Sequence, residues 1–212
     1  MSGLATLLRQ RGFRIVGTDP RVDDVRDRFQ GTGIELHQTQ DGSRIPKDVG
    51  MVVRTAAMLP GHPELQTAAS LGVPIITYAE ALGALMAESK GVAVAGTHGK
   101  TTTTAMIVSC LKYAGIDPGF VVGGFVPGLG TSSDSGTAPI FVAEACEYTR
   151  SFLQLAPQIA VITNMEEDHL DIYGNLDAIK DAFISFASLL PVDGLLVYSA
   201  DCANTTSILD RV

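Results

Sequence analysis

The sequence predicts an α/β protein whose strands form parallel sheets. Short apolar runs typical of strands alternate with amphipathic segments typical of helices along most of the chain. One apolar run, residues 91–95, is bounded by glycine and leads directly into a glycine turn and a helix-compatible segment. Hydrophobic residues make up 46% of the 212 residues and charged residues 18%, which is enough for a core and argues against disorder.

Composition also narrows the range of functions. The net charge of −8 argues against broad nucleic-acid binding, although a local phosphate site remains compatible with it. No apolar run reaches about 18 residues, so we expect no membrane span, and the N-terminus lacks the basic region of a secretory signal. Cys110, Cys146 and Cys202 have no metal-like spacing. An odd number of such thiols fits a reduced, cytoplasmic protein.

Residues 1–88 are expected to form a Rossmann-like domain with a parallel sheet. The expected helices cover residues 3–11, 21–30, 63–71 and 78–88. The expected strands cover residues 13–17, 34–36, 50–55 and 73–77. Open doubly wound sheets usually start with a strand whose glycine turn feeds the first helix, whereas this chain starts on a helix. We therefore expect an opening strand and glycine loop to be absent from this chain.

A short polar link at residues 88–91 marks the expected domain boundary. Residues 89–212 are expected to form an incomplete α/β domain of the P-loop type, C-terminally truncated. Its expected strands cover residues 91–95, 119–123, 140–144, 159–163 and 194–198. Its expected helices cover residues 102–113 and 175–190, and the Gly-, Ser- and Thr-rich residues 123–138 are expected to be a loop.

The turn after the first of these strands has the layout of a phosphate-binding loop. Gly96 and Gly99 let the backbone approach phosphate oxygens, and the amides of the following helix point toward an anion. Lys100 is expected to contact the β- and γ-phosphates, and Thr101 to bind Mg²⁺. The longer form of the motif needs glycine where Val94 stands, so an ordinary turn is the alternative. The flanking strand and helix favour the phosphate loop.

Two further strand ends carry acidic residues. Glu144 ends an apolar strand and is expected at the carboxyl edge of the sheet, where a carboxylate can bind Mg²⁺. Residues 163–173 follow the next strand and contain four acids, an asparagine, a histidine and a tyrosine. Such a loop suits magnesium and nucleotide phosphates better than zinc. Each feature alone has a solvated-loop alternative, and their shared edge with the phosphate loop favours a joint site.

Three motifs together resemble the Mur ligases, the ATP-dependent amide-forming enzymes of peptidoglycan precursor synthesis. They are GTHGKTTT at residues 96–103, EACEYTRSFL at 144–153 and TNMEEDHLDIY at 163–173. Within the family the motifs are most similar to the branch whose substrates are UDP-N-acetylmuramate, L-alanine and ATP. The resemblance extends over nearly the whole chain and implies a UDP-sugar-binding domain followed by an ATP-binding domain.

The resemblance also implies roles for individual residues. Lys100 and His169 are the expected catalytic residues, and Thr101, Glu144 and His169 the expected magnesium ligands. The expected UDP-sugar contacts are Asp19 and, as a weaker match to the family pattern, Thr55. The expected ATP-binding residues are Gly96, Thr97, His98, Gly99, Lys100, Thr101, Thr102 and Asn164.

Departures from the family pattern refine the expectation. Sister ligases carry a modified lysine about fourteen residues after the motif histidine, at the position of Phe183, and the alanine-adding branch lacks it. The later ATP contacts and the amino-acid domain implied by the family are not found before Val212, so we expect this chain to be a fragment. Three alternatives remain: a ligase that recycles murein tripeptide, a non-catalytic nucleotide- or UDP-sugar-binding module, and a simple P-loop ATPase.

Overall fold

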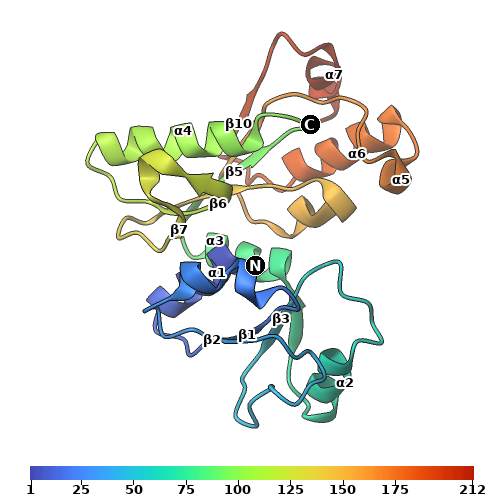
Figure 1. Ribbon diagram of the computed structural model, residues 1–212. Coiled ribbons are helices and arrows are strands. Elements are labelled where there is room, and N and C mark those ends of the chain that lie inside the picture. The colour runs from blue at the N-terminus through green and yellow to red at the C-terminus, as the bar shows by residue number, and fades with distance from the viewer. The chain divides into compact units, whose positions relative to one another are not determined.

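A computed structural model describes residues 1–212, and it contains two compact units that divide between Ala81 and Leu82 (Figure 1). The boundary expected from the sequence lies between residues 88 and 89, within the link that follows helix α3 (Tyr78–Ala87). None of the helices is both long and apolar enough to cross a membrane.

The first unit contains two small parallel sheets. Strand β1 (Val16–Thr18) pairs with β2 (Glu35–His37), and β3 (Val52–Arg54) pairs with β4 (Ile75–Thr77). Strands β1, β3 and β4 are shorter than expected, and β2 has the expected length but begins one residue later. The two pairs are separate sheets rather than one. The helices of this unit are α1 (Ser2–Gln10) and α2 (Pro63–Ser70).

The expectation of a helix over residues 21–30 is wrong. The segment instead forms two 3-10 helices, Val22–Asp24 and Arg26–Phe29. Val25 between them has φ −121, which interrupts helical geometry. The apolar positions that produced the helical pattern are nevertheless used, because Val22 and Phe29 are both buried. Short 3-10 turns can therefore bury the same face that an amphipathic helix would bury.

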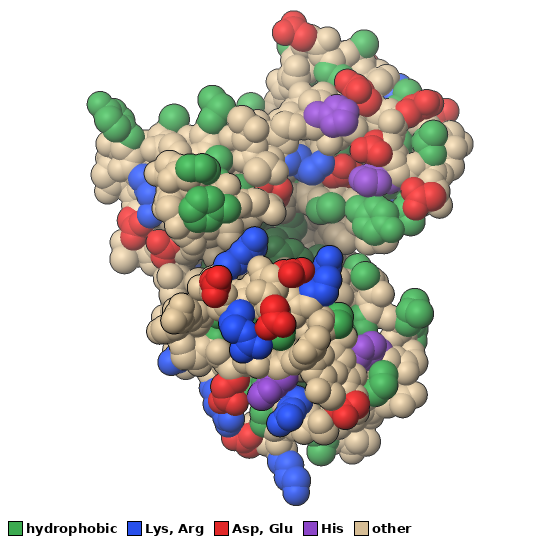
Figure 2. All heavy atoms as spheres, in the orientation of Figure 1, with side chains coloured by type: hydrophobic (Ala, Val, Ile, Leu, Met, Phe, Trp, Pro, Cys, Tyr) green, Lys and Arg blue, Asp and Glu red, His purple; other side chains and the backbone are tan.

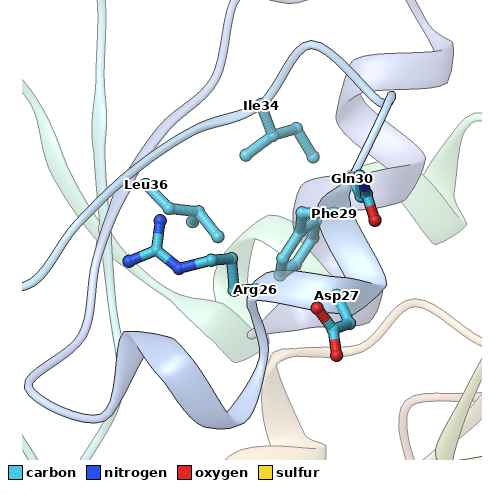
Figure 3. Close-up of a pocket in the computed structure, with 6 residues that line it drawn as sticks. All are labelled: Arg26, Asp27, Phe29, Gln30, Ile34 and Leu36. Atoms are coloured by element: carbon cyan, nitrogen blue, oxygen red, sulfur yellow. The ribbon is translucent and has the colours of Figure 1, made fainter.

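The visible face of the first unit has mixed charge (Figure 2). Arg14 pairs with Glu35 and Arg26 with Asp23, both at exposed positions. Close to this surface is a cavity of about 300 Å³ with a mixed polar and apolar lining (Figure 3). Its lining residues are Arg26, Asp27, Phe29, Gln30, Ile34 and Leu36.

The second unit is built on one six-stranded sheet with the order β10-β9-β5-β8-β6-β7. Its strands are β5 (Lys90–Ala95), β6 (Gly119–Val126), β7 (Thr131–Asp134), β8 (Ile140–Glu144), β9 (Ile159–Ile162) and β10 (Leu195–Tyr198). All neighbours are parallel except β6 and β7, which form an antiparallel hairpin. The expectation of a loop over residues 123–138 is therefore wrong, since β6 is longer and β7 was not expected. Polar residues in β7 lie on an edge strand, where a weak apolar pattern is sufficient.

Helices cover this sheet and complete its core. Helix α4 (Lys100–Tyr113) contacts β5, β6 and β8, and α6 (Leu176–Ala187) starts at an Asn175 side chain that accepts a hydrogen bond from Ala178 N. Short helices α5 (Leu170–Tyr173) and α7 (Ala203–Thr206) and 3-10 helices at Pro127–Leu129, Tyr148–Gln154 and Leu209–Arg211 complete the unit. One core cluster contains Val92, Val108, Phe120, Val122 and Val142.

Phe183 is part of a second apolar contact, on α6. It is fully buried and packs edge-on against Phe152, with 5.3 Å between the ring centroids. Phe152 also stacks on Phe186 at 4.9 Å. The position at which sister ligases are expected to carry a modified lysine is thus occupied here by a core aromatic ring.

Substitution of Gly83 by alanine is expected to destabilise the second unit. A Cβ atom at this position on α3 would lie 1.9 Å from the backbone oxygen of Gln154, so one of the two segments must move. We expect a loss of about 1–3 kcal/mol in the free energy of unfolding, the usual range for overpacking. Urea denaturation of Gly83→Ala and wild type measures it, and equal midpoints would contradict this close packing.

Candidate active site

The phosphate loop lies at the carboxyl end of the central strand β5, between the ends of β8 and β9. Gly96 has φ +140, and Gly99, the residue before α4, is in the left-handed region with φ +81. L-residues with a Cβ atom adopt such angles at a cost, so both glycines fit their positions. The chain therefore reverses within four residues and starts α4 directly at Lys100.

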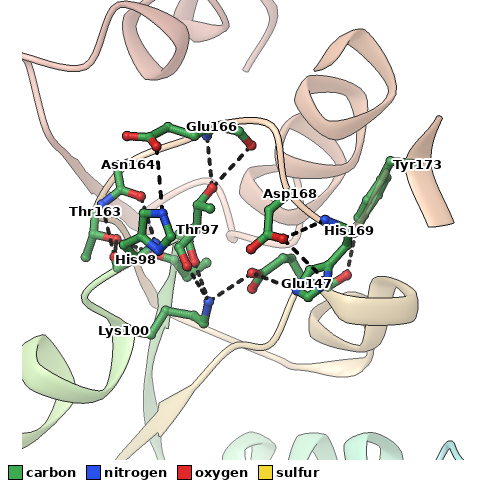
Figure 4. Close-up of polar contacts among 12 residues, drawn as sticks. Thr97, His98, Lys100, Glu147, Thr163, Asn164, Glu166, Asp168, His169 and Tyr173 are labelled. Atoms are coloured by element: carbon green, nitrogen blue, oxygen red, sulfur yellow. Dashed lines mark hydrogen bonds and ion pairs between the residues drawn. The ribbon is translucent and has the colours of Figure 1, made fainter. Parts of the chain in front are cut away.

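The loop after β9 (residues 163–166) holds the phosphate loop in place through a set of hydrogen bonds, which we call the clamp (Figure 4). The Asn164 side chain accepts a hydrogen bond from His98 N at 2.8 Å and donates one to His98 O at 3.0 Å. Thr163 Oγ1 donates to His98 O at 2.6 Å, and Thr97 N donates to the backbone oxygen of Asn164 at 3.1 Å. Thr97 Oγ1 accepts from Glu166 N at 2.9 Å. Hydrogen bonds thus join two strand ends that are distant in sequence.

This clamp determines which amides remain for an anion. The amides of Thr97 and His98 are used within the protein. The first hydrogen bond of α4 runs from Thr103 N to Gly99 O, so the amides of Lys100, Thr101 and Thr102 have no helical acceptor. These three groups, together with the positive end of the helix dipole, make the helix start the anion-binding part of the loop.

Lys100 folds back over the loop that precedes it. Its ammonium group donates to Gly96 O at 2.6 Å, to Thr97 O at 3.1 Å and to Glu147 Oε1 at 2.9 Å. An ammonium group has three N–H donors, so all three are engaged. The Lys100 side chain is 18% exposed, which places its charge at the edge of the buried interior.

Glu147 is a site residue that the sequence analysis did not identify. It lies three residues beyond the end of β8, and its side chain is only 5% exposed. Oε1 is shared between Lys100 Nζ and His169 Nε2, at 2.9 and 3.8 Å. Oε2 is buried and has no hydrogen-bond partner. A buried carboxylate with an unused oxygen is costly unless a cation or donor reaches it.

Asp168 and His169 complete a cluster of candidate metal ligands with Glu147. One ligand atom from each of the three residues lies within 4.8 Å of the others. Two carboxylates and one imidazole, with one carboxylate oxygen unpartnered, fit a hard divalent cation such as Mg²⁺. In Figure 2 the histidine side chains of the second unit lie among acidic ones. The donor set is thus compatible with the metal expected from the sequence, with a partly different choice of ligands.

Three residues with unfavourable backbone angles lie in the segments that form this cluster. Thr149, Arg150 and His169 are the non-glycine residues with positive φ, at 52, 57 and 50°. The Tyr148 ring also packs edge-on against His169, with 5.0 Å between the ring centroids. Left-handed backbone at non-glycine residues is often found at functional sites. The two segments that carry Glu147 and His169 are therefore held in unusual conformations next to each other.

Tyr173 contacts the backbone of Glu147, because its hydroxyl group donates a hydrogen bond to the Glu147 backbone oxygen. Burial, and then the negative charge of Glu147, raises the pKa of Tyr173 from its usual 10 to about 12. A phenol whose folded-state pKa is raised contributes stability that is fully present below pH 10 and is lost as the pH rises toward 12.

We therefore expect wild type to lose more stability than Tyr173→Phe when the pH rises from 9 to 11.5. Chemical denaturation at a series of pH values gives the difference in the free energy of unfolding between the two proteins. Because other tyrosines and lysines titrate equally in both proteins, their contributions cancel. A difference that stays constant over this range would show that the Tyr173 hydroxyl does not titrate abnormally.

The other residues expected at the ATP and metal site lie outside the cluster of Glu147, Asp168 and His169. Glu144 accepts a hydrogen bond from Gly123 N at 2.7 Å and lies outside the cluster around Glu147. Thr101 and Thr102 are exposed and line a shallow groove of about 420 Å³ along α4. The groove continues over Met106. The structure thus brings together Lys100, Asn164 and His169 with the loop, while Glu144 contacts a neighbouring strand.

The two residues expected at the UDP-sugar site follow strand ends in the first unit. Asp19 comes after β1, and its side chain accepts a hydrogen bond from Arg21 N at 2.8 Å. Thr55 comes after β3, and its hydroxyl accepts from Ala57 N at 3.4 Å. The carboxyl ends of parallel strands are the usual place for ligands in such folds, so both positions are compatible with binding. Neither residue lines the cavity near Phe29.

Comparison with known proteins agrees with this architecture. Residues 94–212 match the family model described as Mur ligase middle domain, and residues 1–90 match the model described as Mur ligase family, catalytic domain. A UDP-N-acetylmuramate–L-alanine ligase of Sorangium cellulosum is 42% identical over 212 residues, which is 100% of this chain and 45% of that protein. This chain thus spans about half the length of the relatives it matches.

Solved structures show the same fold. The UDP-N-acetylmuramate:L-alanyl-gamma-D-glutamyl-meso-diaminopimelate ligase of Neisseria meningitides is 29% identical, with a TM-score of 0.90 over 100% of this chain and 71% of that one. The UDP-N-acetylmuramate-alanine ligase of Thermotoga maritima is 28% identical, with a TM-score of 0.81 over 98% of this chain and 48% of that one. Together with the clamped phosphate loop and the two matched family models, these findings show that the chain belongs to the Mur ligase family.

Proposed function

We propose that this chain provides the UDP-sugar- and ATP-binding parts of a cytoplasmic ligase that joins L-alanine to UDP-N-acetylmuramate in peptidoglycan precursor synthesis. The observation that supports it most is the joint site at the β5, β8 and β9 ends, where Lys100 and His169 meet around Glu147. The identity of about 42% to named L-alanine ligases over the whole chain supports the choice of substrates.

The proposed reaction has two steps. The lactyl carboxylate of UDP-N-acetylmuramate attacks the γ-phosphorus of ATP, so that ADP leaves and an acyl phosphate forms. The uncharged amine of L-alanine then attacks the acyl carbon, the phosphate leaves, and an amide bond remains. The net products are UDP-N-acetylmuramoyl-L-alanine, ADP and phosphate.

Two anions meet in the first step, so positive charge must be concentrated at the phosphates. Lys100 and the amides at the start of α4 supply it from the protein, with Gly96 and Gly99 allowing close approach. The clamp formed by Asn164 keeps Thr97 and His98 fixed while phosphate charge moves. We propose that Thr102 also contacts the nucleotide, and that Asp19 and Thr55 contact the UDP portion of the substrate.

We propose that the metal ligands are His169, Glu147 and Asp168, whose ligand atoms lie within 4.8 Å of one another, and that Thr101 and Glu144 complete the metal site from outside this cluster. A divalent cation bound there would neutralise phosphate charge and polarise the γ-phosphoryl group. The protein's own contribution is to orient His169, whose backbone N donates to Asp168 Oδ1 at 2.7 Å.

Phosphate release tests the proposal. The protein is incubated with ATP and Mg²⁺ and with UDP-N-acetylmuramate, L-alanine, both or neither. We expect phosphate and the amide product only when both are present. L-Alanyl-γ-D-glutamyl-diaminopimelate in place of L-alanine separates the tripeptide-recycling alternative, because two solved structures with this fold are murein peptide ligases. Phosphate release without either substrate would indicate a simple ATPase, and ATP binding without any release a binding module.

A further inference from the structure

Glu147 occupies an unusual position in the second unit. Its carboxylate is almost fully buried, one oxygen contacts Lys100, and the other has no partner. Figure 4 shows the carboxylate between the Lys100 ammonium on one side and Asp168 with His169 on the other. The Glu147 carboxylate thus lies between one cation, the Lys100 ammonium, and two residues that could hold a second cation together with it.

Lys100 cannot contact a phosphate without giving up a present contact. All three of its N–H donors are used, by Gly96 O, Thr97 O and Glu147 Oε1. The two carbonyl groups belong to the phosphate loop itself, in which the neighbouring Thr97 N and His98 O are hydrogen-bonded to the loop after β9. Glu147 comes from the segment after β8, so its contact is the one that an incoming phosphate can replace.

Loss of that contact would leave the Glu147 carboxylate buried without a cation. Uncompensated buried charges are strongly unfavourable, and a triphosphate nearby adds further negative charge. Asp168 and His169 lie on the other side of Glu147 with ligand atoms within 4.8 Å. A divalent cation bound to this cluster would replace the positive charge that Lys100 takes away.

We propose that Glu147 exchanges Lys100 for a divalent cation when nucleotide binds, and that this exchange couples metal binding to nucleotide binding. Glu147 is then a positioning residue: it orients Lys100 over the phosphate loop, and it favours release of Lys100 only when a metal ion binds. The inference rests on the proposed nucleotide site, so one of its tests uses metal alone.

The first test measures Mn²⁺ binding without nucleotide, by the electron paramagnetic resonance signal of the free ion. In Lys100→Met the Glu147 carboxylate no longer has its ammonium partner, so Mn²⁺ need not displace a cation. We expect Lys100→Met to bind Mn²⁺ at least about tenfold more tightly than wild type. The double variant Lys100→Met/Glu147→Gln is expected to lose this gain. Equal Mn²⁺ affinity in Lys100→Met and wild type would overturn the exchange.

The second test measures binding of the β,γ-imido analogue of ATP with EDTA and with Mg²⁺, by calorimetry. The ratio of the two dissociation constants gives the coupling between metal and nucleotide. We expect Glu147→Gln to bind metal-free analogue more tightly than wild type and to show a coupling ratio about tenfold smaller. Glu167→Gln, which removes the same charge from an exposed position in the neighbouring loop, should keep the wild-type ratio.

The two tests separate this inference from the proposed function. If no protein binds the analogue, the nucleotide site is wrong, and the Mn²⁺ measurement still decides the exchange. If wild type binds the analogue and Glu147→Gln has the wild-type coupling ratio, Glu147 only supports Lys100 structurally and the exchange is wrong. The first test compares Lys100→Met with wild type and the second compares Glu147→Gln with wild type. A folding defect in one of these single variants therefore leaves the other comparison decisive.

Discussion

Lys100→Met is expected to lower the free energy of unfolding by about 3–5 kcal/mol in buffer with EDTA, the usual effect of breaking a buried ion pair. Its partner, the Glu147 carboxylate, is 5% exposed and already has one oxygen without a hydrogen bond. Removal of the ammonium leaves that charge uncompensated. The same substitution should weaken binding of the ATP analogue with Mg²⁺ roughly 10- to 100-fold, since it removes a charge-assisted contact to phosphate.

A double variant separates these two effects. Lys100→Met/Glu147→Gln has no buried charge at this position, so we expect most of the lost stability to return, to within about 2 kcal/mol of wild type. Its affinity for the ATP analogue should stay low, because no ammonium group is restored. Urea denaturation and calorimetry on the three proteins measure both quantities. Full stability in the single variant would contradict the buried pair, and restored affinity in the double variant would contradict the phosphate-binding role of Lys100.

Gly96→Ala is expected to disrupt the phosphate loop more than any other single methyl group added to it. The residue has φ +140, and its Cβ atom would lie 2.0 Å from Thr163 Oγ1, which is part of the clamp. Backbone strain and overpacking together are expected to cost about 2–6 kcal/mol. Movement of Thr163 would also break its hydrogen bond to His98 O, so we expect binding of the ATP analogue to be lost.

Gly99→Ala is the matched control on the same loop. Gly99 also has positive φ, at +81, but a Cβ atom there would have no heavy atom within 4 Å. Only the cost of a positive φ at a residue with a Cβ atom remains, and we expect the free energy of unfolding to fall by about 1–2 kcal/mol. Denaturation midpoints of the two variants compare the costs directly. If Gly99→Ala is as harmful as Gly96→Ala, the contact with Thr163 is not what determines the loop's geometry.

The phosphate loop was predictable because all its information is local. Strand, glycine turn and helix follow one another in sequence, and the structure has them at Lys90–Ala95, Gly96–Gly99 and Lys100–Tyr113. The closeness of the loop after β9 was also predictable, since parallel strands end at one edge. The details of the clamp were not, because Asn164 acts through two hydrogen bonds to a backbone 66 residues away.

Glu147 was missed for a related reason. The strand pattern indicated Glu144, the last residue of β8. Glu147 lies in an irregular segment, where no sequence periodicity predicts which way a side chain points. Its burial results from the turn into the Tyr148–Gln154 helix and from contacts with Lys100 and Tyr173. The available signal was a second acid three residues after the strand end, in the same motif that pointed to the family.

The fate of an oxygen atom tests the proposed ligase chemistry most directly. The lactyl carboxylate of UDP-N-acetylmuramate is labelled with ¹⁸O, and the protein is supplied with ATP, Mg²⁺ and L-alanine. If the carboxylate attacks the γ-phosphorus, one ¹⁸O atom is expected in the released inorganic phosphate, with ADP as the other product, by mass spectrometry. Amide formation with unlabelled phosphate, or with the label in AMP, would contradict the acyl-phosphate mechanism assigned to this site.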